Sequence, residues 1–204
     1  MIDAARLQKV YEAIDAANRA DPQAIEVDGA QVPANLIYGQ RMTAEMERFE
    51  PQASEALKIA ARGQHIERWI LPRASFPMDK PGYYRWRRQL KEHHAARLAE
   101  IMAPLGYDAA TIERVGTLVR KQKPKEDADI QTLEDVVCVV FLKYELDAFV
   151  AKYKADNAKF ADILAKTWRN MSARGHAAAL ALPPPPAVVD LLHQGLAALD
   201  APAA

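Results

Sequence analysis

Residues 93–122, HHAARLAEIMAPLGYDAATIERVGTLVRKQ, decide the fold class. A helix over about 83–103 is predicted to end at the stretch APLGY, where proline and glycine cannot continue it. Asp108 then precedes a second helical stretch, 109–122, and is a good N-cap because its side chain can accept from the free backbone N–H groups. Two strong helices with a short break between them favour an all-α protein.

The rest of the chain shows the same helical periodicity. Further helices are predicted over 3–19, 34–49, 52–68, 130–153 and 156–172. The third has Ser54 or Gln52 near its start, and the stretch LEDVVCVVFLKYEL (133–146) is apolar nearly all round, as in a central helix. The stretch between 19 and 34 indicates a loop that has room for a short extended piece. Nothing demands a β-sheet.

The C-terminus looks separate from this body. Four prolines at 183–186 form a stiff spacer, and an amphipathic helix is predicted over 187–199. We therefore expect one helical domain over 1–182, with 183–204 appended to it.

Composition narrows the class of protein. Lys and Arg number 27, and Asp and Glu also number 27, so no overall charge favours nucleic acid or an anionic membrane. The single cysteine, Cys138, allows no internal disulfide and lies in the apolar stretch VVCVVFL. No apolar leader or membrane span is visible. We expect a cytoplasmic protein, with no membrane partner, that is a possible homodimer.

Polar residues inside otherwise apolar helices are the candidate site. They are Gln40, Arg41, Gln64, His65, His93, His94, Glu134 and Asp135. Burying an imidazole or a carboxylate without a partner costs several kcal/mol, so buried members of this set must meet each other, water or a metal. The alternative is structural. A lone buried histidine is more often hydrogen-bonded in the core, and acids in the first turn of a helix offset its dipole.

The order of these segments resembles the HD-domain superfamily of metal-dependent phosphohydrolases. The similarity covers about 36–145 and includes EALKIAARGQHIERW (55–69), residues 93–122 and QTLEDVVCVVFL (131–142). Shorter stretches are similar to hallmarks of a family of unknown function, family 4202: YGQRMT (38–43), QHIERW (64–69), LEDVVC (133–138) and KTWRNMS (166–172). The resemblance implies an HD-domain-like helical bundle with an appended C-terminal helix.

It also implies a metal site, altered at several positions. Gln40 or Arg41 stands where the superfamily has its first histidine, and Gln64-His65 stands at its His-Asp doublet. A later histidine is missing near 121–123. The ligands that match are His65, His94 and Asp135, which would hold one divalent metal (Fe, Mn, Zn or Ni), unless the altered site holds none. Three ligands and a water form the open pattern of catalytic metals. Glu134 would act as general base, and Arg41 and Arg68 would hold an anion.

Basic residues supply a second signal. Residues 62–97 contain nine Lys or Arg and three acids, and YYRWRRQLK (83–91) mixes arginines with aromatic rings. Arginine suits phosphate because its planar donors match the oxyanion. We therefore expect a small phosphorylated or anionic ligand, with nucleotide-like ligands included. Its binding residues would be Gln40, Gln64, Arg73, Arg85 and Lys121. For Arg87, Arg88 and Lys91, a solvated helix face is at least as good an interpretation.

Three functions follow. The leading one is a metal-dependent hydrolase acting on such a ligand. An iron-dependent oxygenase of the HD type is the first alternative, and a non-catalytic ligand-binding module with a degenerate metal site is the second. Nucleic-acid binding ranks last, because it would need one exposed basic stripe.

Overall fold

The computed structural model describes residues 2–122, 127–153 and 157–183, which form two compact units. The first is Met1–Leu133 and the second is Glu134–Ala204. The predicted helix 187–199 and the prolines after Pro183 lie outside the described residues. The predicted domain 1–182 with its appended segment stays a prediction.

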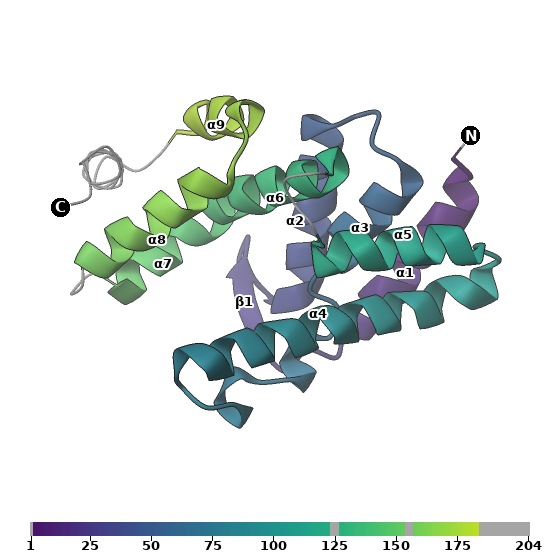
Figure 1. The fold of residues 1–204 in the computed structure, drawn as a ribbon, viewed down its shortest axis with the longest axis horizontal. Coiled ribbons are helices and arrows are strands. Elements are labelled where there is room, and N and C mark those ends of the chain that lie inside the picture. The colour runs from purple at the N-terminus through teal and green to yellow at the C-terminus, as the bar shows by residue number, and fades with distance from the viewer. Residues whose placement is uncertain (1, 123–126, 154–156, 184–204) are drawn as a thin grey trace. The chain divides into compact units, whose positions relative to one another are not determined.

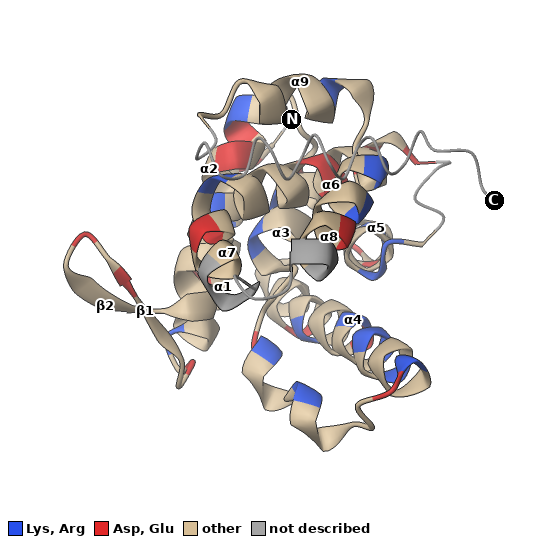
Figure 2. Cartoon of the chain, turned by 90° about the vertical axis from the view of Figure 1, so that its left-hand side faces the viewer, with Lys and Arg blue, Asp and Glu red and all other residues tan. Residues whose placement is uncertain are grey.

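The first unit is built almost entirely of helices, which confirms the all-α prediction (Figure 1). Its helices are α1 (Ala4–Asn18), α2 (Ala34–Phe49), α3 (Glu55–Gly63), α4 (Lys80–Met102), α5 (Ala109–Arg120) and the beginning of α6 (Ala128–Val140). Three short 3-10 turns follow the chain at Arg68–Ile70, Arg73–Ser75 and Ala103–Leu105. The helix α3 contacts α1, α2 and α5, and Figure 2 shows it between α2 and α5. It therefore forms the centre of this unit.

Local sequence signals place most helix starts. The side chains of Asp3, Ser54, Asp79 and Asp108 each accept a hydrogen bond from a backbone N–H three residues further on. The predicted N-cap at Asp108 is confirmed, with Asp108 Oδ1 2.8 Å from the backbone N of Thr111. These caps satisfy N–H groups that have no partner inside their own helix.

The third helix ends earlier than predicted. The pattern indicated 52–68, but α3 stops at Gly63. Gln64 and His65 lie in the turn that follows, and Glu67 adopts a left-handed backbone with φ 51°. Gly63 also lies against Leu98 of α4, where an added Cβ would come within 2.4 Å of a Leu98 methyl group. Apolar periodicity does not register such a turn, because Ile66 and Trp69 continue the pattern beyond it.

A β-hairpin replaces part of the predicted loop. Strand β1 (Ala24–Val27) pairs antiparallel with β2 (Ala30–Pro33). The two residues between them, Asp28 and Gly29, both have positive φ (50° and 80°), as a tight hairpin turn requires. The dipeptide Asp-Gly was the sequence signal for this hairpin.

The second unit contains the remaining helices. After α6 the chain makes a π-helical turn at Phe141–Glu145, followed by α7 (Leu146–Tyr153), α8 (Asn157–Asn170) and α9 (Ala173–Leu180). The predicted single helix 130–153 is therefore interrupted. Leu146, Phe160 and Leu164 form one buried cluster, and Cys138, Val139 and Met171 form another. Cys138 is a buried thiol, as its apolar surroundings predicted.

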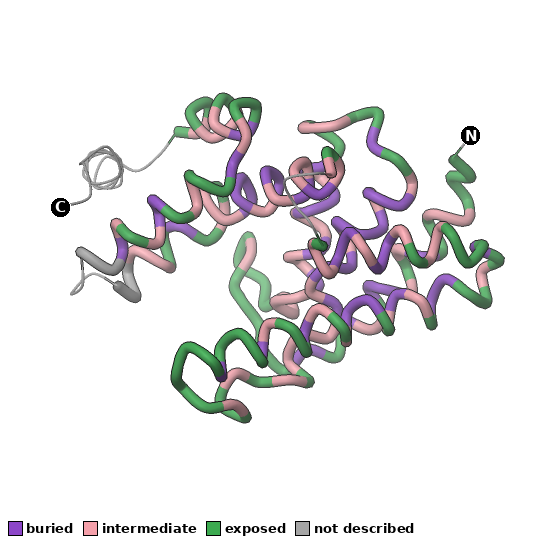
Figure 3. The backbone as a smooth tube through the Cα atoms, in the orientation of Figure 1, coloured by how far each residue is buried: buried purple, intermediate pink, exposed green. Residues whose placement is uncertain are grey.

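Figure 3 shows the buried residues along α3 and on the inner sides of the helices around it. Within the described part of the chain, we find no helix with both the length and the apolar character that a bilayer crossing requires.

One buried ion pair connects the first three helices. Arg62 of α3 donates from Nε to Asp15 Oδ1 (2.9 Å) and from Nη2 to Asp15 Oδ2 (2.6 Å). Its third nitrogen, Nη1, reaches Thr43 Oγ1 of α2 at 3.2 Å. The backbone of α2 comes close enough to Arg62 that a Cβ on Gly39 would lie 2.8 Å from the Arg62 carbonyl oxygen. The two charged side chains are only 11% and 12% exposed, so either one left alone would be strongly destabilising.

We predict that Arg62→Met lowers the free energy of unfolding by about 3–5 kcal/mol, because it leaves the Asp15 carboxylate buried without its partner. The double variant Arg62→Met/Asp15→Leu should recover more than half of this loss. Urea unfolding followed by circular dichroism measures both.

The matched control is Glu100→Gln, which removes an exposed pair between Arg97 and Glu100 (2.8 Å). We expect it to cost about 1 kcal/mol or less. A loss for Arg62→Met as small as that of the control would contradict the assigned role of the buried pair.

Candidate functional site

Two histidines of the first unit lie close together. His94 comes from the middle of α4, and His65 comes from the turn after α3. Their ring centroids are 6.2 Å apart. His94 is 2% exposed, whereas His65 is half-buried. Segments separated by almost thirty residues therefore bring two imidazoles to one place.

The hydrogen bonds define the protonation of His94. Its Nδ1 lies 2.7 Å from the carbonyl oxygen of Ile66, which can only accept, so Nδ1 carries the proton. The other nitrogen, Nε2, is buried and has no hydrogen-bond partner among the described residues. In neutral His94 this nitrogen is an open acceptor.

His65 is fixed differently. Its Nε2 lies 3.1 Å from Nη1 of Arg68, and an arginine can only donate, so this nitrogen accepts. The ring stacks on Tyr38 of α2 at a centroid distance of 4.2 Å. Gln64 supports that tyrosine by donating from Nε2 to its hydroxyl oxygen at 2.6 Å. The Gln64–His65 pair thus holds Tyr38 and Arg68 in place.

Both imidazoles are held neutral. Burial, together with the neighbouring His93, Arg68 and Arg87, lowers the pKa of His94 to about 3, although the hydrogen bond to Ile66 opposes this shift. Burial also brings the pKa of His65 well below its usual range, and the Arg68 guanidinium adds to this effect. Protonating either ring would place another positive charge in a cationic region.

A small pocket lies between these rings. It measures about 20 Å³, which is room for roughly one water-sized group. Gln64 and both histidines line it, with Leu90 and Val119 as apolar walls. Its charged lining residues are Arg68, Arg87, Lys91 and Lys121. No carboxylate lines it among the described residues, so the pocket favours an anion.

The predicted site residues separate into two groups. The structure brings together His65, His94, Gln64, Arg68 and Lys121 around this pocket. The predicted ligand Asp135 belongs to the second unit, where its oxygens accept from the backbone N (2.8 Å) and Oγ (2.6 Å) of Ser172. Glu134 also belongs to that unit. The three-residue metal site and the role of Glu134 as general base therefore stay predictions.

Other predicted binding residues lie elsewhere in the first unit. Gln40 donates to Asp15 Oδ2 at 3.4 Å and so contacts the ion pair of Arg62. Arg73 donates to the carbonyl oxygens of Phe76 (3.1 Å) and Asp79 (3.4 Å), which ties the loop before α4 together. Arg85 is exposed on α4, and Arg41 is half-buried on α2. None of these four lines the histidine pocket as described.

Two pocket residues were missed by the sequence interpretation, Arg87 and Lys91. For both, a solvated helix face was at least as good an interpretation of the sequence. Their spacing from His94, seven and three residues back along α4, was the available signal, because such positions share one face of a helix.

The donor groups around the histidine pocket decide whether it fits a metal ion. Among the described residues, no group of three or more His, Cys, Asp or Glu side chains could hold a metal ion. In the first unit, His65 Nε2 already accepts from Arg68, and four cationic groups surround the pair. This set does not by itself fit a divalent cation.

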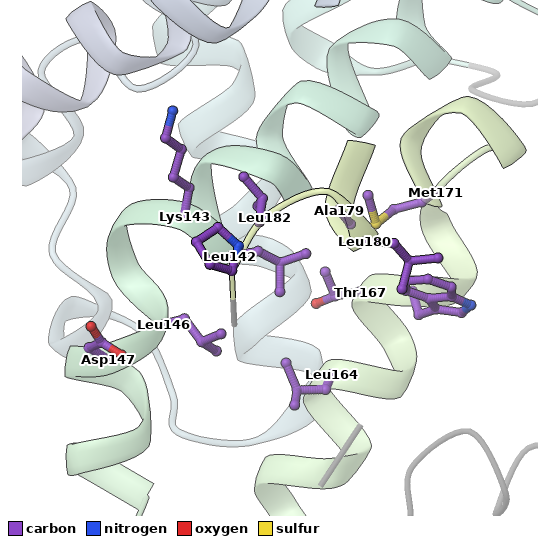
Figure 4. Close-up of a pocket in the computed structure, with 12 residues that line it drawn as sticks. Leu142, Lys143, Leu146, Asp147, Leu164, Thr167, Met171, Ala179, Leu180 and Leu182 are labelled. Atoms are coloured by element: carbon purple, nitrogen blue, oxygen red, sulfur yellow. The ribbon is translucent and has the colours of Figure 1, made fainter. Parts of the chain in front are cut away.

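A larger cavity lies within the second unit (Figure 4). It measures about 250 Å³ and is mainly apolar, with walls that include Leu142, Leu146, Leu164 and Leu182. Lys143 points away from these side chains in the close-up. Among its described lining residues, Lys143, Asp147 and Thr167 are polar but form no recognisable donor set, so it is the weaker candidate site.

The fold and the pocket define a class: an all-α protein with two neutral histidines in a cationic pocket. Residues 8–192 match the family model described as Domain of unknown function (DUF4202), and the chain belongs to that family. No curated protein and no solved structure matches the chain.

We predict that His94 is neutral and protonated on Nδ1 between pH 5 and pH 8. Nitrogen-15 shifts of the imidazole in two-dimensional NMR distinguish the two tautomers directly. In an unfolded chain this ring would titrate near pH 6.5. Its contribution to stability is therefore complete above that pH and is lost as the pH falls toward about 3. Protonation on Nε2, or titration near pH 6.5 in the folded protein, would contradict this assignment.

Proposed function

We propose that this protein binds a small phosphorylated or otherwise anionic metabolite in the pocket between His65 and His94. One observation carries the proposal. Four cationic side chains and two neutral imidazoles line the pocket, and no described carboxylate does. A protein with this function is a ligand-binding module. A hydrolase acting on such a ligand would need the same pocket.

The side chains have distinct roles in this proposal. Arg68 is held in place, because it donates to His65 and lies 5.0 Å above the ring of Trp86. Arg87 makes no hydrogen bond or ion pair with any described residue, so its guanidinium can donate to an oxyanion. His94 Nε2 can accept a hydrogen bond, and a singly protonated phosphate ester can donate one from its O–H group.

We predict that Arg87→Gln weakens the binding of inorganic phosphate at least tenfold, because it removes charge-assisted hydrogen bonds worth about 1.5–3 kcal/mol. Isothermal titration calorimetry at low salt measures the change. Arg85→Gln is the matched control, since Arg85 is an exposed arginine of the same helix that lines no described part of the pocket.

The control variant should bind phosphate as the wild type does. Equal losses in both variants would show a diffuse electrostatic effect without a defined site. Absence of phosphate binding by the wild-type protein at millimolar concentration would overturn the proposed function.

A metal-dependent phosphohydrolase is the second candidate, and one observation favours it. His94 presents an open Nε2 while Nδ1 donates to a backbone carbonyl, which is the arrangement that orients metal-binding histidines. The resemblance of 36–145 to the HD-domain superfamily supports the same reading. The predicted ligands are His65, His94 and Asp135, and Arg41 would assist with the anion. Since the donors within the first unit do not fit a metal alone, we assign no step to one.

The two candidates differ in a measurable way. If the protein is a metal-dependent hydrolase, it should retain a stoichiometric divalent metal on purification, and His94→Ala should lose that metal while Arg87→Gln keeps it. A metal-free preparation that binds phosphate with unchanged affinity after addition of Mn²⁺ or Zn²⁺ would contradict the second candidate. The proposed binding function would then stand alone.

A further inference from the structure

We propose that the histidine pocket is the inner end of a longer groove, and that its ligand is a phosphate ester with a planar ring some distance from the phosphate. This inference rests on the proposed function and names the class of ligand. The inner pocket has about 20 Å³, room for roughly one water-sized group. One phosphate oxygen can enter it, and the rest of any phosphate ester must lie outside it.

A second, larger pocket has room for the rest of the ester. It measures about 550 Å³ and shares Arg87 and Lys91 with the inner pocket. Tyr83, Tyr84 and Arg88 of α4 also line it. We call the two pockets together the α4 groove. Since Arg87 and Lys91 belong to both, a ligand bound to these two side chains touches both compartments.

The helix sets the spacing along the groove. The inner pocket draws on α4 at Arg87, Leu90, Lys91 and His94, and the tyrosines lie about seven residues earlier. At 1.5 Å per residue, this separation is about 10 Å along the helix axis. A ring bonded directly to a phosphate is too short for this distance, whereas a ring joined through a sugar-sized spacer can span it.

The two tyrosines of the outer compartment suit a planar group. Tyr84 is 59% exposed and Tyr83 is 43% exposed, although both are aromatic. Tyr83 packs against Trp86 at a centroid distance of 5.8 Å and meets Tyr84 edge-on, also at 5.8 Å, so the two rings support each other. Exposed aromatic faces stack readily on flat ring systems.

The two compartments also differ in their carboxylates. In the outer compartment, Arg120 donates to Glu92 at 2.7 Å, which offsets one of its cations. The inner pocket has no described carboxylate. The described lining of the inner pocket therefore has one carboxylate fewer than that of the outer compartment, and the phosphate is expected at the inner end with the ring toward the tyrosines.

Three probes of increasing size test the inference on the full-length protein: inorganic phosphate, ribose 5-phosphate and adenosine monophosphate. We expect adenosine monophosphate to bind at least fivefold more tightly than ribose 5-phosphate, which has the same phosphate and spacer but no flat ring. Calorimetry gives the three dissociation constants.

Variants of Tyr84 show whether the tighter binding of adenosine monophosphate depends on the outer compartment of the groove. Tyr84→Ala should abolish the advantage of adenosine monophosphate and leave the affinity for inorganic phosphate unchanged. Tyr84→Phe is the matched control and should keep the advantage, because it preserves the ring. Tyr84 is exposed, so neither change threatens the fold.

The outcomes separate this inference from the proposed function. If inorganic phosphate binds and the ring adds nothing, the groove assignment is wrong and the phosphate pocket stands. The groove assignment is also wrong if Tyr84→Ala weakens all three probes equally. If the wild-type protein binds none of the probes, the proposed function fails as well.

Discussion

The buried pair between Arg62 and Asp15 is the constraint on which the first unit depends. A bidentate ion pair fixes both the distance and the orientation of the helices that carry it, because both carboxylate oxygens and two guanidinium nitrogens must align. It holds the last turn of α3 against α1, and the contact of Arg62 with Thr43 adds α2. Gln64 and His65 follow Arg62 within three residues. The position of the histidine pocket therefore depends on an interaction outside it.

Electrostatics explains the character of that pocket. Two imidazoles near each other are commonly associated with metals, but the charges around these two are positive. Burial and the neighbouring guanidinium groups hold both rings neutral, as the lowered pKa values of His65 and His94 express. Neutral rings contribute hydrogen-bond donors and acceptors without repelling a cationic neighbour. The histidines can thus share a pocket with Arg68 and Lys121.

Local signals predicted much of the fold. The N-cap at Asp108 and the burial of Cys138 follow from short-range chemistry and from apolar surroundings, both visible in the sequence. The end of α3 at Gly63 does not follow from them, because it depends on the close approach of Leu98 from another helix. The hairpin at Asp28 and Gly29 had a clear turn signal, but its strands are mostly exposed and lack a distinct apolar alternation.

The site was predictable to a similar degree, and for the same reason. Gln64, His65, Arg68 and His94 attract attention in the sequence because their side chains carry chemistry in apolar surroundings, and the structure gathers them. Gln40 attracts attention equally, yet its partner is Asp15, twenty-five residues away. Only the packing of α1 against α2 shows that Gln40 belongs to the ion pair and not to the pocket. Arg87 and Lys91 are the opposite case. Their sequence pattern favours a solvated helix face, and only the packing of the turn after α3 against α4 makes them pocket residues.

The cationic lining has a consequence for stability as well as for binding. Like charges around a cavity repel one another. A folded state that places cations together without a carboxylate between them is therefore less stable than one that includes it. Functional pockets often retain this kind of local cost. Here Arg87 lines the pocket together with Arg68 and Lys91, and no described acid lines it. If the proposed function is right, an anion bound beside Arg87 gains charge-assisted hydrogen bonds and reduces the repulsion among these cations. The same argument explains why the ring of His94 stays neutral: a proton there would add to the repulsion that an anion removes.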